Sequence, residues 1–286
     1  MAIVLGPNRY GKAETRLVRV TRDGETHSLA DLNVSIALSG DLGATHQTGD
    51  NSGVLPTDTM KNTVYAFAKE HGVGAPEDFG LLLARHFVLT QPQIHRAKVS
   101  IEAFEWERLG PHSFQRKGDY TRTAQIDVGG GSAQVVSGLN GLVLLNSTAS
   151  EFHGYPRDRY TTLAETTDRI LATAVDAGWR HGSDMSDWDE SFAAVRDALV
   201  NAFVNTYSYS LQQTLLSMGT RVLETRPEIA EIRLALPNKH HYVVDLTPFG
   251  LENAHEVFIS GDRPYGLIEG VVTRDDAPAA SAEWYL

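Results

Sequence analysis

The chain has 286 residues, of which 42% are apolar and 21% charged, a composition typical of a globular protein with one large domain or two ordinary ones. The net charge of −11 argues against nucleic-acid binding, which needs a basic face. It also disfavours long-range attraction of an anionic substrate, so any bound anion must be held by local positive groups. Because the chain contains no cysteine, disulfides, thiolate metal sites and thiol nucleophiles are excluded.

Neither end of the chain carries a targeting signal. Residues 1–6 lack a basic segment and are too short an apolar run for a secretory signal, and no segment approaches the roughly 18 apolar residues of a membrane span. Residues 282–286 differ from the peroxisomal address Ser-Lys-Leu. We therefore expect a cytoplasmic protein that does not enter a membrane.

The first half of the chain contains strand patterns on either side of two helix patterns. Residues 32–38 alternate apolar and polar side chains, which is the period of a half-buried strand, and Gly72 ends the first helical run. The expected elements are strands at residues 16–21 and 32–38, helices at 57–71 and 76–87, and strands at 94–106 and 120–128.

The glycine-rich segment at residues 129–132 separates the halves. With no lysine and no helix after it, we interpret it as a hinge or bulge and not as a phosphate-binding loop. The second half continues with Asn140-Gly141, which predicts a short hairpin between residues 132–136 and 142–148.

Two helices are expected in this second half. A capping box at residues 186–189 precedes the first helix, and a second capping box at 210–213 opens the other. Strands at residues 228–236 and 242–247 follow, and we expect the tail from Arg274 to be poorly ordered.

Both halves thus show the order strand-strand-helix-helix-strand-strand. This order predicts an α+β fold of two units, residues 1–131 and 132–286, each with an antiparallel sheet that carries its helices on one face. Such sheets leave exposed edges that must be paired or covered.

Two segments of the first half could carry chemistry. Lys12 is either a solvated lysine or, where a pocket withdraws it from water and lowers its pKa, a general base near neutral pH. Thr57 follows Pro56 at the start of a helix, where we expect it to be the N-cap, and the N–H groups of a helix start are free to meet an anion.

Three residues of the second half could bind a planar ligand. Arg169 could pair with Asp168, or its flat donor fork could match the carbonyl and ring nitrogen of a heterocycle. Phe152 could belong to the core or stack on a ring. Gln212 could be an ordinary surface residue or a ligand contact at a helix N-terminus.

The segment that contains Asn238 and His240 is polar after a proline and could be an ordinary turn. Its adjacent His240 and His241 invite a metal interpretation. Neighbouring side chains of an extended segment face opposite ways, however, and no cysteine or other ligand pattern is near, so we expect no metal.

Taken together, four segments of this chain resemble the urate oxidase (uricase) family. They are Tyr10-Gly11-Lys12, residues 56–63 (Pro-Thr-Asp-Thr-Met-Lys-Asn-Thr), residues 152–169, and residues 236–240 (Leu-Pro-Asn-Lys-His). The resemblance runs from about Asn8 to about Gly266. One departure is Asn146, where the family usually has lysine.

The resemblance implies a tandem T-fold, in which subunits join their antiparallel sheets into a barrel and barrels stack into a homotetramer with active sites at subunit interfaces. It implies that urate, dioxygen and water give 5-hydroxyisourate and hydrogen peroxide without a cofactor. Urate and dioxygen are then the expected partners.

The resemblance also assigns roles to residues. Lys12 is the base, Thr57 relays the proton, and His240 joins their proton network. The residues expected to contact the purine or the oxygen above it are Thr57, Asp58, Phe152, Arg169, Leu211, Gln212 and Asn238.

Two alternatives stay open at this point. Another T-fold purine or pterin enzyme, such as a cyclohydrolase or aldolase, would share the fold, although cyclohydrolases of this fold use a zinc site with cysteine. A non-catalytic purine-binding scaffold would keep Phe152, Arg169 and Gln212. It would not need Lys12, Thr57 and His240, which are all present.

Overall fold

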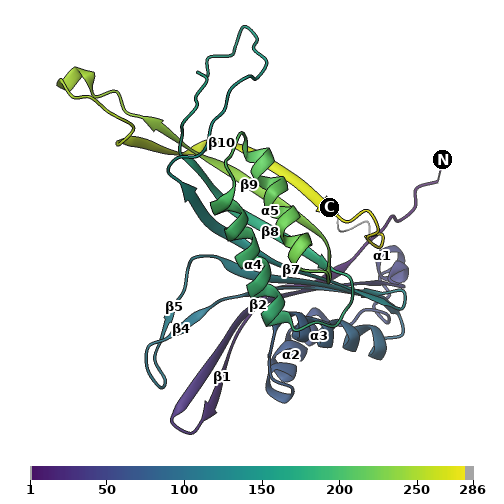
Figure 1. The fold of residues 1–286 in the computed structure, drawn as a ribbon. Coiled ribbons are helices and arrows are strands. Elements are labelled where there is room, and N and C mark those ends of the chain that lie inside the picture. Colours follow the sequence, from purple (N-terminus) through teal and green to yellow (C-terminus); the bar gives the residue numbers. More distant parts are fainter. Residues whose placement is uncertain (1, 281–286) are drawn as a thin grey trace. The chain divides into compact units, whose positions relative to one another are not determined.

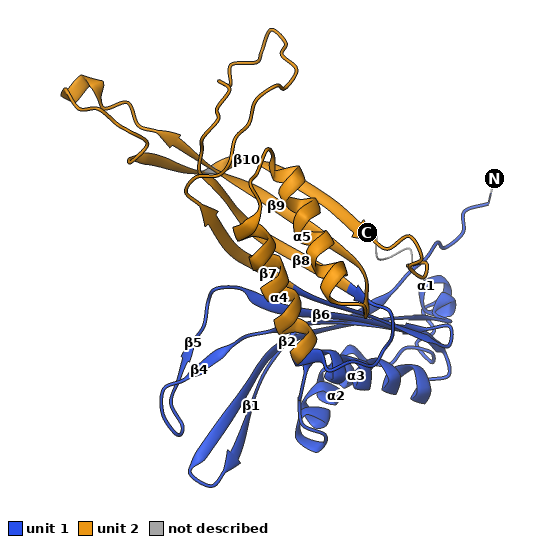
Figure 2. Cartoon of the chain, viewed as in Figure 1, with its two compact units in different colours: residues 1–138, 180–189 blue, residues 139–179, 190–286 orange. Residues whose placement is uncertain are grey.

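The computed structural model describes residues 2–280, and of Asp262 only the backbone. The chain is an α+β protein that divides into two compact units, residues 1–138 with 180–189 and residues 139–179 with 190–286 (Figure 2). The expected boundary after Gly131 lies at the start of strand β7 (Ser132–Asn146), whereas the first range of unit 1 ends inside this strand, at Gly138.

The first unit is built on the antiparallel strand order β1-β2-β3-β6, with β4 and β5 forming a separate ribbon (Figure 1). Helix α2 packs on β1, and α3 packs on β3 and β6. Its elements are β1 (Tyr10–Asp23), β2 (Thr26–Gly40), α1 (Gly43–Thr48), α2 (Thr57–Glu70), α3 (Pro76–Thr90), β3 (Ile94–Ala103), β4 (Trp106–Arg108), β5 (Phe114–Arg116) and β6 (Thr121–Gly129).

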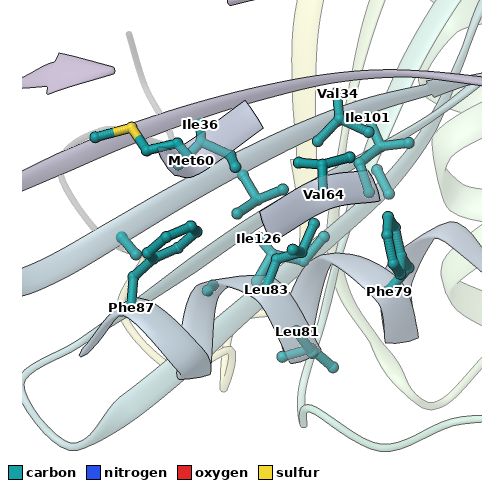
Figure 3. Packing of buried hydrophobic residues seen from close by; sticks show 14 of the residues in the cluster. Val34, Ile36, Met60, Val64, Phe79, Leu81, Leu83, Phe87, Ile101 and Ile126 are labelled. Atoms are coloured by element: carbon teal, nitrogen blue, oxygen red, sulfur yellow. The ribbon is translucent and has the colours of Figure 1, made fainter. Parts of the chain in front are cut away.

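The core of the first unit lies between the sheet and these two helices. Val64 of α2 and Leu83 of α3 are fully buried, and they lie close to Ile126 of the sheet in Figure 3. Along β3, Ala97, Val99 and Ile101 are buried and the residues between them are partly exposed, as the period of 2 requires when one face is covered. Burial of this apolar face, at roughly 25 cal/mol for each Å² removed from water, stabilises the unit.

The second unit has the strand order β7-β8-β9-β10, and α5 packs on β9 and β10. Three of its elements begin or end within the residue ranges of the first unit. The elements are β7, β8 (Leu171–His181), α4 (Trp188–Asn205), α5 (Leu211–Thr225), β9 (Ile229–Val243), the short 3-10 helix η1 (Thr247–Phe249) and β10 (Phe258–Thr273).

The predicted hairpin at Asn140-Gly141 is wrong. Strand β7 continues through it, and Gly141, with φ of 81°, lies inside the strand and donates its N–H to Asp176 at 2.7 Å. The turn is instead the glycine segment that we interpreted as a hinge: Gly130 and Gly131 join β6 to β7 with φ of 61° and 78°. Two consecutive positive φ angles are what a two-residue hairpin turn needs, and glycine adopts them without steric cost.

The helix caps, the later strands and the C-terminal tail were predicted with mixed success. Helix α4 begins at Trp188, so Asp187 and not Ser186 precedes it, whereas the cap at Ser210 is confirmed by the 3.2 Å bond from the Gln213 N–H. Strands β8 and β10 were not predicted. Arg274 in the predicted disordered tail donates to the carbonyl of Ile229 at 2.9 Å, while residues 281–286 of that tail lie outside the described residues.

No helix within the described residues is both long enough and apolar enough to cross a bilayer.

A glycine lets one helix of each unit lie close to its sheet, and alanine there should destabilise the fold. A Cβ at Gly219 of α5 would stand 2.7 Å from Cβ of Val272, and a Cβ at Gly80 of α3 would stand 3.0 Å from Cγ1 of Ile126. Overpacking of this kind costs about 1–3 kcal/mol, which exceeds the roughly 1 kcal/mol that alanine gains over glycine in a helix.

We expect Gly219→Ala to lower the free energy of unfolding in urea more than Gly80→Ala, because the tip of Ile126 can rotate whereas Cβ of Val272 is fixed to the backbone. An unchanged or raised unfolding midpoint for Gly219→Ala would contradict this packing.

Candidate functional site

A bulge in β1 sets the direction of Lys12. Lys12 pairs with Ile36 and Thr15 with Val34, so β1 contains one residue more than β2 between these pairs. Directly paired residues share a face of the sheet. Because Ile36 and Val34 are buried, Lys12 stands on the face covered by the helices, half-buried, and not on the opposite face. Lys12 therefore lies within strand β1, and not ahead of the first strand as the sequence suggested.

The bulge is held by specific hydrogen bonds. Glu14 adopts a positive φ of 58°, which is unfavourable for a residue with a side chain. Its N–H donates to Oγ of Ser35 at 3.0 Å, and its carboxylate accepts from Nδ2 of Asn33 at 2.6 Å. A Cβ at Gly11 would collide with the carbonyl of Ile36, so the position before Lys12 must be glycine.

A tyrosine connects this strand to the start of α2. The hydroxyl of Tyr10 donates to the carbonyl of Leu55 at 3.1 Å, and burial raises the pKa of the Tyr10 hydroxyl. Leu55 lies two residues before Thr57, so the bond fixes the start of β1 against the start of α2.

Thr57 is the first residue of α2 and not its N-cap, which corrects the prediction. The N-cap is Pro56, and no side chain caps this helix. The Thr57 hydroxyl makes no hydrogen bond to another residue in the described part of the chain, so it is available for other chemistry.

Asp58 follows Thr57, and its pKa is affected by the positive charge of Lys12 on β1. Its carboxylate bonds the ammonium of Lys61 and accepts from Nδ2 of Asn62 at 3.0 Å. The bond from Lys61 lowers the pKa of Asp58, and the positive charge of Lys12 lowers it further. The structure thus brings Lys12 close to the first turn of α2 within the first unit.

In the second unit, a short ladder holds Phe152 and Arg169. Phe152 and Thr166 exchange backbone bonds of 2.8 and 3.1 Å, and the N–H of Arg169 donates to the carbonyl of Ser150 at 2.9 Å. The guanidinium carbon of Arg169 lies 5.3 Å from the Phe152 ring centroid, and that ring also stacks on Tyr155 at 4.9 Å. Phe152 is half-buried and does not belong to the core.

Arg169 does not pair with its neighbour Asp168. The Asp168 carboxylate accepts from Oγ1 of Thr148 at 2.7 Å, whereas Nε of Arg169 donates to Oγ of Ser150 at 3.1 Å. Burial lowers the pKa of Arg169, as expected for a cation partly withdrawn from water. The guanidinium therefore keeps its two terminal nitrogens for a ligand.

Helix α5 begins beside the same ladder. Ser208 pairs with Ser150 in a parallel bridge, and Ser210 caps the helix. The side chain of Leu211 is buried, so only its backbone can meet a ligand, whereas Gln212 in the same turn is exposed.

Asn238 and His240 lie in strand β9, and not in a turn. They pair with Gly266 and Gly261 of β10, and the intervening β10 residues bulge out of the ladder. Residues two apart on a strand share a face. Burial lowers the pKa of His240, and the charges of Arg169 and His241 lower it further. His240 is therefore near Arg169 and is neutral at neutral pH.

Within residues 2–280, no group of three or more His, Cys, Asp or Glu side chains could hold a metal ion. His241, the neighbour of His240, has its Nδ1 3.0 Å from the carbonyl of Lys239. The departure at Asn146 has a structural role, because its Nδ2 donates to the carbonyl of Phe203 at 3.1 Å.

The expected site residues divide between the two units. Those of the first unit, called the first-unit cluster, are Lys12, Thr57 and Asp58, and those of the second unit, called the second-unit cluster, are Phe152, Arg169, Leu211, Gln212, Asn238 and His240. Sequence reasoning missed Ser150 and the hydroxyl of Tyr10. Tyr10 lies inside the segment that contains Lys12, and Ser150 lies two residues before the segment that begins at Phe152, but neither belongs to a pattern with a known chemistry.

Comparison with known proteins gives one consistent answer. The family model for uricase matches residues 8–127 and 135–269. The uricase of Arthrobacter globiformis is 49% identical over 284 residues, which cover 99% of this chain and 94% of that protein. The uricase of Dictyostelium discoideum is 36% identical over 276 residues, covering 93% of this chain and 96% of that protein. The crystal structure of the Arthrobacter globiformis uricase matches with a TM-score of 0.97 and covers 100% of both chains.

The effect of the Arg169 charge on His240 predicts a measurable titration. We expect the pKa of His240 to lie below the ordinary value of about 6.5 and to rise in Arg169→Gln, where the nearby positive charge is gone. It should stay below the ordinary value, because burial is the larger cause. Since the folded pKa is the lower one, the stability that neutral His240 contributes is present above pH 6.5 and lost as pH falls through the folded pKa.

Proton NMR titration would follow the imidazole signal, assigned with His240→Gln. Arg157→Gln, which removes an exposed arginine that stands over Tyr155, is the matched control and should leave the titration unchanged. A titration that is identical in Arg169→Gln and in the unaltered chain would contradict the assigned proximity.

Proposed function

This chain belongs to the uricase family, and we propose that it oxidises urate through the two residue clusters described above. Urate, dioxygen and water are converted to 5-hydroxyisourate and hydrogen peroxide, as a step of purine degradation. Two electrons pass from urate to dioxygen, and water supplies the new hydroxyl group. The observation that carries the proposal is the guanidinium of Arg169 beside the face of Phe152, next to the neutral His240.

No organic cofactor is needed in this scheme. Dioxygen is a triplet and reacts slowly with closed-shell molecules, so most oxidases use a flavin or a metal. The urate dianion is itself electron-rich and can reduce dioxygen directly. The protein's task is then to deprotonate urate, to hold its ring flat and to place dioxygen over it.

The second-unit cluster binds the purine. Phe152 stacks on the ring, and the two terminal nitrogens of Arg169 donate to a carbonyl and a ring nitrogen on one edge. Gln212 reads the opposite edge with its amide, and Leu211 offers its backbone N–H. The partial positive charge at the start of α5 suits an anionic ring. Local groups thus supply the attraction that a chain of net charge −11 lacks.

The first-unit cluster moves protons. Lys12 is the base, the hydroxyl of Thr57 relays the proton, and His240 completes the network. Asn238 holds the dioxygen or water above the ring, and Asp58 lies at the edge of the purine site. The free hydroxyl of Thr57 and the nearness of Lys12 to the first turn of α2 support these roles.

We further propose that the fold is a tandem T-fold whose subunits join their sheets into a barrel and form a cytoplasmic homotetramer. Apolar side chains are exposed on both end strands: Val18 on β1 is 58% exposed, and Ile259 on β10 is 59% exposed. Edges of this kind need a partner strand. In this assembly the first-unit cluster of one subunit meets the second-unit cluster of another.

The direct test of the function is an assay of metal-stripped protein. With no flavin absorbance and no added metal, it should consume urate and dioxygen in equal amounts and release hydrogen peroxide at the full rate. Activity that disappears on chelation and returns with one particular metal would refute the cofactor-free scheme.

The proton pair gives a second prediction. Lys12→Met and Thr57→Ala should each slow the chemical step by roughly 10²- to 10⁴-fold, the usual effect of a positioned proton-transfer group, while urate still binds without oxygen. Because the two groups act as one unit, the double variant should be little slower than either single variant in single-turnover kinetics. If the rate loss of the double variant equals the product of the two single losses, Lys12 and Thr57 do not act as one unit.

A third prediction concerns the shared site. Thr57→Ala and Arg169→Ala chains, each inactive alone, should recover part of the activity when they are co-expressed, because some interfaces then combine an intact Lys12-Thr57 cluster with an intact binding cluster. The control is a mixture of Arg169→Ala and Phe152→Ala chains, both damaged in the second unit, which should recover nothing. A fully active monomer would contradict the shared site.

A further inference from the structure

Three hydroxyl side chains lie buried beneath the binding residues of the second unit. Ser150, Ser208 and Thr214 are each 0% exposed. A buried hydroxyl without a partner is costly, so such groups persist where hydrogen bonds satisfy them. Because solvent does not reach them, these hydroxyls act on other protein groups.

Ser150 binds Arg169 twice. Its backbone carbonyl accepts the N–H of Arg169 at 2.9 Å, and its Oγ accepts from Nε of the guanidinium at 3.1 Å. The first bond fixes the position of the residue and the second fixes the rotation of its side chain. With Nε occupied, the guanidinium presents only its terminal nitrogens, beside the ring of Phe152.

Ser208 connects this serine to the start of α5. Its N–H donates to the carbonyl of Ala149 at 2.9 Å, and its carbonyl accepts from Glu151 at 2.9 Å, so Ser150 is flanked by two backbone bonds. Its Oγ accepts from Oγ1 of Thr214 at 2.8 Å and donates to the carbonyl of Ser210 at 3.1 Å. Ser210 immediately precedes the turn that carries Gln212.

We propose that Ser150 is a positioning residue for the oxidation of urate: it aims the guanidinium of Arg169 and, through its bridge to Ser208, holds that guanidinium at a fixed spacing from Gln212. This inference rests on the proposed function, since it requires that Arg169 and Gln212 grip the two edges of the purine. Two donors on a rigid frame bind a flat ligand without losing side-chain freedom on binding, which is the advantage of preorganisation.

The test is the dissociation constant of urate under anaerobic conditions, where no turnover occurs. Ser150→Ala keeps both backbone bonds and removes only the bond to Nε. We expect urate to bind roughly 10-fold more weakly, the scale of one hydrogen bond to a charged group. Ser150→Cys, which nearly preserves the volume but replaces a good acceptor with a weak one, should weaken binding in the same direction and serves if the alanine variant does not fold.

A purely structural role would also affect binding, so a double-variant cycle is needed. If Ser150 acts through Arg169, then Ser150→Ala should change urate binding by less than about twofold in an Arg169→Gln background. The matched control is Thr148→Val, which removes a hydroxyl that bonds Asp168, the neighbour of Arg169, at 2.7 Å. It should leave urate binding unchanged.

The outcomes separate the two proposals. Absence of anaerobic urate binding by the unaltered chain would overturn the proposed function and this inference together. Unchanged binding by a folded Ser150→Ala chain, equal loss in Thr148→Val, or full additivity with Arg169→Gln would overturn the inference alone.

Discussion

The positive charge of Arg169, partly withdrawn from water, is the constraint on which the binding half of the site depends. A cation in such a position needs acceptors and aromatic faces in place of the water it has lost. Ser150 and Phe152 provide them, and the same charge adds to the effect of burial in lowering the pKa of His240. The ladder around Ser150, tied to the start of α5 through Ser208, is the frame that holds this guanidinium.

The two units divide the work between them. The groups proposed to bind urate come mainly from a ladder and a helix start in the second unit. The groups proposed to move protons are Lys12 on a bulged strand and Thr57 at a helix start in the first unit, together with His240 of the second. Each cluster is held by bonds within its own unit, such as Tyr10 to Leu55 and Arg169 to Ser150. The Arg169 guanidinium and the strand that carries Lys12 are therefore held in place by separate sets of local contacts.

Sequence reasoning predicted structure correctly where adjacent residues determine it, and failed where hydrogen bonds to distant residues determine it. The starts of α2 at Thr57 and α5 at Leu211 follow from adjacent residues. Asn140-Gly141 encodes a positive φ, but whether the chain turns there depends on cross-strand bonds such as that of Gly141 to Asp176. The candidate site residues were named through the resemblance of their segments to a known family. The role of Ser150 could not be predicted from the sequence, because it depends on a hydrogen bond to Arg169, 19 residues later in the chain.

The bulge between Lys12 and Thr15 has a consequence for how this protein tolerates change. The face on which the lysine stands is set by residue count, since one extra residue shifts the alternation of every side chain before it. A one-residue deletion there would leave Lys12 opposite Ile36, on the same face. A chain of unchanged length that closed the bulge into regular pairing would relieve the backbone at Glu14, yet it would set Lys12 opposite Ala37 and turn its side chain to the other face. Selection for thermal stability alone would accept such a chain. The bulge is therefore retained for the direction that it gives Lys12 and not for stability.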